Sequence, residues 1–302
     1  MRRRLLIGSG FAVLFVLGTV AYFKTRDLAT LESVLARLPS DNAAVLSIDF
    51  DALRRGGVFE MLSGPVVEEE PEYKTFVEKT AFDYRRDLDH VFISFYPEAV
   101  YFLVRGRFDP RRLEAYAIEQ GGGCSAGGLC RMPGSQAARK ISFFLLKNNL
   151  MAMAVSADES AATRMSEPAK RARPIAAPKQ PLWLSLPSST LKKSSEFPAG
   201  TQLFAKAMED AESAILSIAP KGKALEAQLE VVCKDAREAS VLAAQFQRMT
   251  AVLREMIEKE KQKPNPADLS GVLTAGVFRQ QDARVLGRWP IERAFLDNLS
   301  KP

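Results

Sequence analysis

The chain has 302 residues, of which 47% are hydrophobic and 26% are charged. This balance excludes a disordered chain, a collagen or a low-complexity array, and the length allows one large domain or two of average size. A formal net charge of +6 is compatible with a nucleic-acid or membrane-surface partner. A single His and three Cys argue against dense metal or acid–base chemistry.

The N-terminus predicts a membrane anchor. Three arginines, Arg2 to Arg4, precede the uncharged stretch Leu5–Phe23. A helix over this stretch would be roughly 28 Å long, close to the hydrocarbon thickness of a bilayer. Because the positive charges precede it, we expect a single-pass signal-anchor with a cytoplasmic N-terminus, the lipid bilayer as partner and an extracytoplasmic, periplasmic body. The alternative is a signal peptide cleaved near Thr19–Ala21.

The positive charge is confined to two segments. Residues 1–27 hold five Lys or Arg and one Asp, a net +4. Residues 164–181 hold five Lys or Arg and one Glu, another +4, which leaves −2 for the rest of the chain. Nucleic-acid binding needs a basic cluster on one folded face, and the sequence shows none. We therefore expect no nucleic-acid partner.

A proline-rich basic segment divides the chain into two halves. It contains four prolines between Glu167 and Pro181, which favours an extended linker over a helix or strand. We accordingly divide the chain into an N-terminal anchor (residues 1–27), a first α+β repeat (28–166), a linker (167–180) and a second α+β repeat (181–302).

The same order of elements is expected in both halves: strand, helix, hairpin, helix, hairpin, helix. In the first half these are Ala43–Ile48, Ala52–Leu62, His90–Tyr96 with Ala99–Phe108, Asp109–Gln120, Ile141–Leu146 with Leu150–Val155, and Asp158–Met165. In the second half they are Leu182–Leu186, Thr201–Asp210, Ala214–Ile218 with Ala224–Cys233, a long helix opened by Asp235, Leu273–Phe278 with Ala283–Trp289, and Ile291–Leu299. Asp51, Asp109 and Asp235 stand where helix caps belong.

Short matches support an internal duplication. Ser94 and Pro97 recur as Ser217 and Pro220 at a constant offset of 123 residues. Hairpins in place of long crossovers imply a mostly antiparallel sheet with helices on one face. The predicted fold class is therefore α+β: an N-terminal transmembrane helix followed by a duplicated, ferredoxin-like sheet-and-helix body.

A motif before the first strand carries a family resemblance. Leu38-Pro39-Ser40-Asp41 is followed by the strand Val45–Ile48 and by Asp49-Phe50-Asp51. This layout resembles uncharacterised bacterial single-span envelope proteins with a large extracytoplasmic α+β region. The resemblance implies neither an activity nor functional residues.

Two cysteines are candidates for a disulfide. Cys124 and Cys130 flank a glycine-rich stretch, and in an oxidising compartment they could pair. Two free thiols are the alternative. Cys233, at the end of a predicted strand, is expected to be a small buried hydrophobic residue. One distant His and this pair offer too few ligands for zinc, so no metal site and no cofactor is predicted.

Short motifs suggest a serine hydrolase only weakly. Ser189 and Lys192 match a Ser-x-x-Lys pattern, and Ser40-Asp41-Asn42 matches the Ser-Asp-Asn of penicillin-binding enzymes. Their order is reversed and no Lys-Thr-Gly strand accompanies them. Asp49 with Asp51 could ligate a cation, but a role as a helix cap explains Asp51 more simply. His90 is the single histidine, and a lone histidine is more often structural than catalytic.

These observations predict a non-enzymatic interaction or scaffold module of the cell envelope with an unidentified protein partner. The alternative is a carrier of a lipid or another apolar ligand, held between helices and sheet. A serine hydrolase is the third hypothesis. No catalytic residue is assigned.

Overall fold

The computed structural model describes residues 30–59, 71–169, 175, 177–197, 201–222 and 224–299. The described strands are β1 (Ala44–Asp49), β2 (Leu88–Phe95), β3 (Ala99–Gly106), β4 (Gly123–Cys124), β5 (Cys130–Pro133), β6 (Lys140–Lys147), β7 (Leu150–Ser156), β8 (Leu182–Pro187), β9 (Ser213–Lys221), β10 (Ala224–Val232), β11 (Val277–Gln281) and β12 (Arg284–Ile291).

Helices occupy most of the connections between the strands. They are α2 (Leu31–Leu35), α3 (Phe50–Arg55), α5 (Pro71–Thr80), α6 (Tyr84–Asp87), α7 (Pro110–Glu119), α8 (Ser188–Leu191), α9 (Gln202–Ala207), α10 (Ala236–Lys259), α11 (Leu269–Thr274) and α12 (Arg293–Leu299). Two short 3-10 helices, η2 (Ala161–Met165) and η3 (Ser194–Glu196), complete the described elements.

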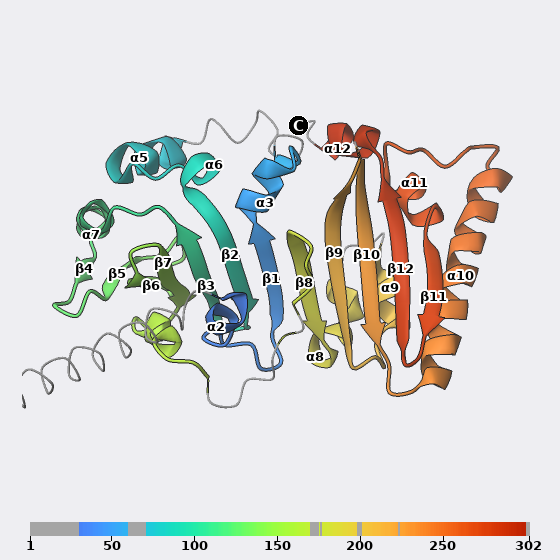
Figure 1. Ribbon diagram of the computed structural model, residues 1–302, viewed down its shortest axis with the longest axis horizontal. Helices are drawn as coiled ribbons and strands as arrows, with labels where there is room; N and C mark the ends of the chain where they lie inside the picture. Colours follow the sequence, from blue (N-terminus) through green and yellow to red (C-terminus); the bar gives the residue numbers. More distant parts are fainter. Residues whose placement is uncertain are drawn as a thin grey trace, which may run out of the picture.

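The strands form one continuous sheet. Its 12 strands follow the order β11-β12-β10-β9-β8-β1-β2-β3-β7-β6-β5-β4. All the ladders between them are antiparallel, including the central β1–β8 pair that joins the two halves. Outward from this pair, β1-β2-β3-β7-β6 and β8-β9-β10-β12-β11 have the same sequence of neighbours (Figure 1).

The predicted fold class is wrong in its architecture. A ferredoxin-like unit contains parallel strands joined by helical crossovers, whereas every ladder in the described chain is antiparallel. The halves are also not two separate sheet-and-helix bodies, because Val45 to Ile48 of β1 pair with Leu182 to Ser185 of β8. The observed architecture is α+β with one large antiparallel sheet.

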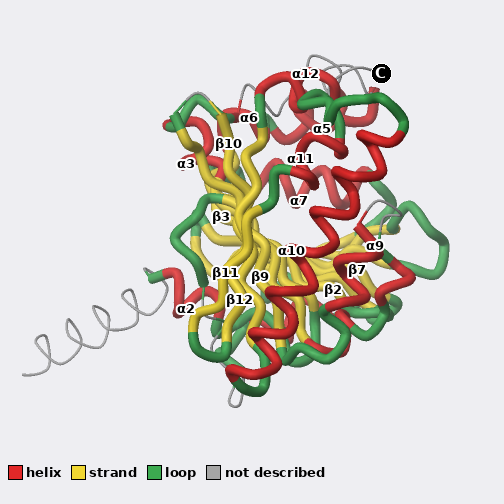
Figure 2. Tube along the Cα trace, turned by 90° about the vertical axis from the view of Figure 1, so that its right-hand side faces the viewer, coloured by secondary structure: helices red, strands yellow, loops and turns green. Residues whose placement is uncertain are grey.

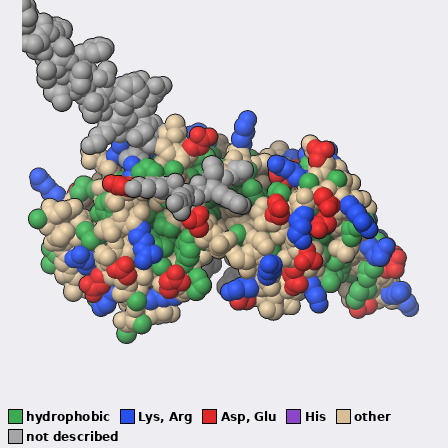
Figure 3. Space-filling model, turned by 90° about the horizontal axis from the view of Figure 1, so that it is seen from below, with side chains coloured by type: hydrophobic (Ala, Val, Ile, Leu, Met, Phe, Trp, Pro, Cys, Tyr) green, Lys and Arg blue, Asp and Glu red, His purple; other side chains and the backbone are tan. Residues whose placement is uncertain are grey.

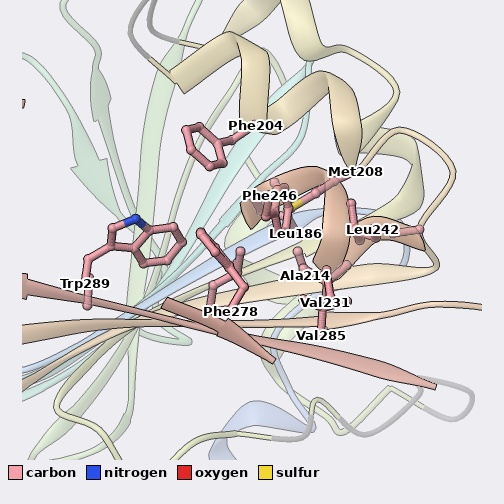
Figure 4. Close-up of a cluster of buried hydrophobic side chains, with 14 of the residues drawn as sticks. Leu186, Phe204, Met208, Ala214, Val231, Leu242, Phe246, Phe278, Val285 and Trp289 are labelled. Atoms are coloured by element: carbon pink, nitrogen blue, oxygen red, sulfur yellow. The ribbon is translucent and has the colours of Figure 1, made fainter. Parts of the chain in front are cut away.

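One face of the sheet is covered by helices along its whole length. In the second half, α9 and α10 pack there around an aromatic cluster in which Phe246 contacts Phe204 and Phe278, with ring centroids 5.6 and 4.9 Å apart. Trp289 meets Phe278 edge-on at 5.1 Å (Figure 4). The same face of the first half packs against α5, α6 and α7 through a second buried cluster.

Among the described residues, the opposite face is covered over the first half and over the adjoining strand β8, where Trp183 is buried. There α2 supplies Val34 and Leu35, and η2 supplies Ala161, Ala162 and Met165, to a cluster built on β1, β2, β3 and β7. In Figure 2, α2 lies on one side of the strands, while α9, α10 and α11 lie on the other. The described residues therefore leave uncovered the outer face of the second half beyond β8.

The predicted membrane anchor is corrected. Among the described residues, no helix combines the length and the apolar character needed to cross a membrane. The longest of them, α10, has a single buried stripe and is otherwise exposed to solvent. The predicted span, Leu5–Phe23, lies outside the described residues. The predictions of a signal-anchor, a lipid-bilayer partner and a single-pass, extracytoplasmic location depended on that span, and the described structure does not support them.

Candidate functional site

The uncovered face of the second half is hollowed into a groove, which we call the open-face groove. It consists of two adjoining cavities of about 1000 and 440 Å³. Ile215, Glu230 and Arg284 line both cavities and so connect them. Figure 1 looks onto this face, with β9, β10 and β12 in front and α9 behind them. Ala177, Pro178 and Gln180, which precede β8, form a wall on the side of the smaller cavity.

Most outward-facing positions of β9, β10 and β12 in the groove are polar, with Ile215 and Leu286 among the apolar exceptions. Their inward neighbours, such as Ala214, Val231 and Val285, are fully buried under α10 and its neighbours. Period-two alternation of this kind is typical of an antiparallel sheet with one face in water. The chain provides no described helix over the outer face, since α12, which follows β12, buries Leu296 in the helical-side cluster.

Side-chain hydrogen bonds hold the groove floor together. Gln228 donates to Glu226 over 3.0 Å and accepts from Gln180 over 2.8 Å, which ties the wall to the sheet. Lys221 also bonds Glu226, and this contact, followed by that of Gln228, keeps the pKa of Glu226 below its usual range despite burial. Arg284 forms an ion pair with Glu230 on the neighbouring strand. The floor is consequently an ordered polar surface.

The structure brings the two predicted hydrolase motifs to one end of the groove. Ser40, Asp41 and Asn42 line the larger cavity together with Ser188 and Lys192. The hydroxyl of Ser189, however, donates to the backbone carbonyl of Asn42 over 3.1 Å. Among the described contacts, none links Ser189 to Lys192. Their meeting follows from the β1–β8 pairing, because both motifs flank that pair of strands.

Ser47, His90 and Asp49 form a second polar group on β1 and β2. The Ser47 hydroxyl lies 2.8 Å from Nε2 of His90, and Nδ1 of His90 lies 3.8 Å from Asp49 Oδ2. The order of atoms matches a serine nucleophile, its base and the carboxylate that orients the base. Ser47 is fully buried, with 0% exposure, and none of the three residues lines a described cavity. The described residues therefore shield the Ser47 hydroxyl from solvent.

Burial also keeps the imidazole of His90 neutral. Its ring stacks on Phe92 with the centroids 4.0 Å apart, and its side chain is 16% exposed. Burial lowers the pKa of His90 to about 4, although the charge of Asp49 acts in the opposite direction. The other Asp49 oxygen, Oδ1, accepts from the Ala52 amide over 2.8 Å and caps α3. The cap predicted at Asp51 is therefore two residues away from the actual one.

The disulfide-forming cysteines, Cys124 and Cys130, lie far from the groove, at the far edge of the sheet. Cys124 and Cys130 face each other in the short β4–β5 ladder, where their sulfur atoms are bonded. Cys130 is 1% exposed and packs with Leu113 and Ala117 of α7. Cys233 is buried with a free thiol, and burial raises its pKa. The described residues contain no group of three or more His, Cys, Asp or Glu side chains that could hold a metal ion.

Loss of the disulfide should destabilise the protein without unfolding it. The bond closes a loop with a sequence separation of 6, for which loop entropy gives about 2 kcal/mol. We expect the Cys124→Ser, Cys130→Ser double variant to lose roughly that much unfolding free energy in urea. Cys233→Ser is the control for changing a cysteine. An unchanged midpoint of the double variant in non-reducing buffer would show that the bond contributes nothing.

Two features of the groove escaped the sequence interpretation. The first is the pairing of Gln180 with Gln228, since nothing in a single sequence indicates contacts across 48 residues. The second is the set of charged residues on β12, which alternation over Arg284–Trp289 could have revealed as the outward face of a half-buried strand. Seen from below, basic and acidic side chains are interspersed over the visible surface (Figure 3).

Comparisons with known proteins identify a shared fold. No protein-family model and no curated protein matches the chain. The solved structure of TP0453 in crystal form III aligns over 88% of this chain and 97% of its own, with a TM-score of 0.52 and 10% identity. Crystal form I of TP0453 aligns over 90% and 98%, with a TM-score of 0.50 and 8% identity. At this identity the similarity concerns the fold alone.

Proposed function

We propose that the protein is a non-enzymatic interaction module that holds a polypeptide segment of a partner protein in the open-face groove. The observation that carries this proposal is the difference between the two halves. On the same side of the sheet, the first half is covered by α2 and η2 of its own chain, whereas the described residues leave the second half beyond β8 with an uncovered, hollowed surface. A partner segment would complete the second half as α2 completes the first.

The size and lining of the groove suit a polypeptide. Its larger cavity, about 1000 Å³, reaches the upper end of the volumes typical of small-molecule sites. It is open rather than enclosed, and side chains of both signs line it, including Asp210, Glu212, Lys192 and Lys234. A segment with its own polar side chains and backbone could satisfy these groups.

The carrier of an apolar ligand is the weaker proposal. Among the described cavities, the one with the most apolar lining lies between α10 and α11, where Leu253, Met256 and Leu273 surround about 230 Å³. That volume is below the range usual for ligand sites. The larger cavities have charged walls, which would be left unpaired against a hydrocarbon chain.

Selection from a displayed library of short random peptides tests the proposal. Ser213 lies half-buried on the floor of the larger cavity, so Ser213→Trp would fill the groove. Ser240→Trp makes the same change at an exposed position of α10, on the other side of the sheet. We expect enriched peptides to bind the wild type and Ser240→Trp equally, and Ser213→Trp at least about tenfold more weakly. No enrichment, or equal binding to all three proteins, would overturn the proposal.

A further inference from the structure

The outer face of the last hairpin carries arginines interleaved with aliphatic side chains. In the β11–β12 ladder, Val277 lies opposite Arg288, Arg279 opposite Leu286, and Gln281 opposite Arg284. Residues directly opposite in a ladder share one face of the sheet. Their buried neighbours, Phe278 and Val285, point to the helical side. We call the outward set Val277, Arg279, Arg284, Leu286 and Arg288 the arginine patch.

Two of the three arginines in the patch form no described ion pair. Arg284 is paired with Glu230, but Arg279 and Arg288 form no ion pair with another described residue. The nearest acidic side chains on β10 are already engaged: Glu226 bonds Lys221 and Gln228, and Glu230 bonds Arg284. Arg288 acts on Glu226 only through its longer-range charge, so both guanidinium groups could pair with an anion without breaking an ion pair to a described residue.

The patch also exposes apolar area between these charges. Val277 is 67% exposed, the most of any large hydrophobic residue in the described chain. It lies beside Arg288, and the partly exposed Leu286 lies beside Arg279. Exposed aliphatic side chains framed by arginine are a composition that protein interfaces favour, because arginine pairs with carboxylates in a bidentate manner and loses less on desolvation than lysine.

We propose that the arginine patch binds an acidic polypeptide segment whose carboxylates pair with Arg279 and Arg288 and whose apolar side chains pack on Val277 and Leu286. This inference rests on the proposed function, and it names the chemistry of the partner. The patch continues into the groove, since Arg284, Leu286 and Arg288 also line the smaller cavity.

A labelled peptide of glutamates with leucine at every second position is the probe, and the same peptide with lysine for glutamate is its control. Fluorescence anisotropy should show binding of the acidic peptide alone, weakening as salt is added. The Arg279→Glu, Arg288→Glu double variant should bind about tenfold or more weakly. Arg248→Glu reverses one charge at an exposed position of α10 and should bind like the wild type.

Three outcomes would overturn the inference. The first is acidic-peptide binding that is unchanged in the double variant. The second is equal binding of the lysine peptide. The third is patch-dependent binding to vesicles of phosphatidylglycerol and phosphatidylcholine without binding of the peptide, which would identify a lipid surface as the ligand. Library peptides that depend on Ser213 but carry no acidic residues would leave the proposed function standing and reject the inference alone.

Discussion

Replacing Phe246 with alanine is expected to lower the free energy of unfolding by about 3–5 kcal/mol, the range for truncating a fully buried aromatic ring. Phe246 is 0% exposed and lies in the centre of α10, between Phe204 of α9 and Phe278 of β11. Its removal leaves a cavity between helix and sheet. Alanine favours a helix more than phenylalanine does, so the loss reports packing and not helix propensity. Urea denaturation followed by circular dichroism measures it.

Val241→Ala in the same helix is the matched control. Val241 is 53% exposed, and its truncation should change stability by no more than about 0.5 kcal/mol. If both variants lost the same small amount, α10 would not be packed through Phe246. If Phe246→Ala failed to fold, Phe246→Leu would retain most of the buried area and should give a smaller, measurable loss.

Local patterns predicted the parts of the fold that depend on neighbouring residues. Asp109 and Asp235 cap α7 and α10 as expected, accepting from amides two or three residues ahead. The buried face of α10 contains Ala239, Leu242 and Phe246, at the three-and-four spacing of an amphipathic helix. The β2–β3 hairpin lies where two apolar runs are joined at Pro97 and Glu98.

Competing local signals explain the local errors. The helix after β1 ends at Arg55, well before the predicted Leu62, because Gly56 and Gly57 interrupt it. Leu273 was placed in a strand, yet Leu269–Thr274 is helix α11, capped by Asp268 through Ser270. An Asp three residues before an apolar run is a cap signal that outweighs β-branched residues in so short a segment.

The site could not be predicted because it depends on contacts between distant segments. The groove exists since β1 and β8, more than a hundred residues apart, pair at the centre of one sheet. Which half of that sheet stays bare is decided by where α2 and η2 pack. The arginine patch depends on the register of β11 against β12, and a shift of one residue would point Arg279 to the other face.

Acidification should destabilise the protein between about pH 6.5 and pH 4 through His90. In the unfolded chain the imidazole takes up a proton near pH 6.5, whereas burial keeps the folded pKa of His90 near 4. Between these values the unfolded state binds one more proton than the folded state. Stability from this source is therefore complete above about pH 6.5 and falls as the pH drops, by roughly 3 kcal/mol in total.

The charges around His90 support the sign of this effect. Asp49 on β1 faces Nδ1 and would stabilise an imidazolium, whereas Arg105, its partner on β3, opposes one. Burial against Phe92 decides between them, because the ring has little contact with water. The charge of Asp49, 3.8 Å from Nδ1, favours a proton on that nitrogen, and in this tautomer Nε2 would accept from the buried Ser47 hydroxyl.

His90→Gln isolates this contribution, since the amide stays neutral at every pH and can still bond Ser47. The unfolding free energy of the wild type minus that of the variant should fall steadily from pH 6.5 to pH 4, because only the wild type loses stability through this side chain. His90 is the single histidine of the 302 residues, so its ring signals can be followed by NMR without assignment. They should titrate well below pH 6. A pKa near 6.5, or a stability difference that does not change with pH, would show that solvent reaches the ring.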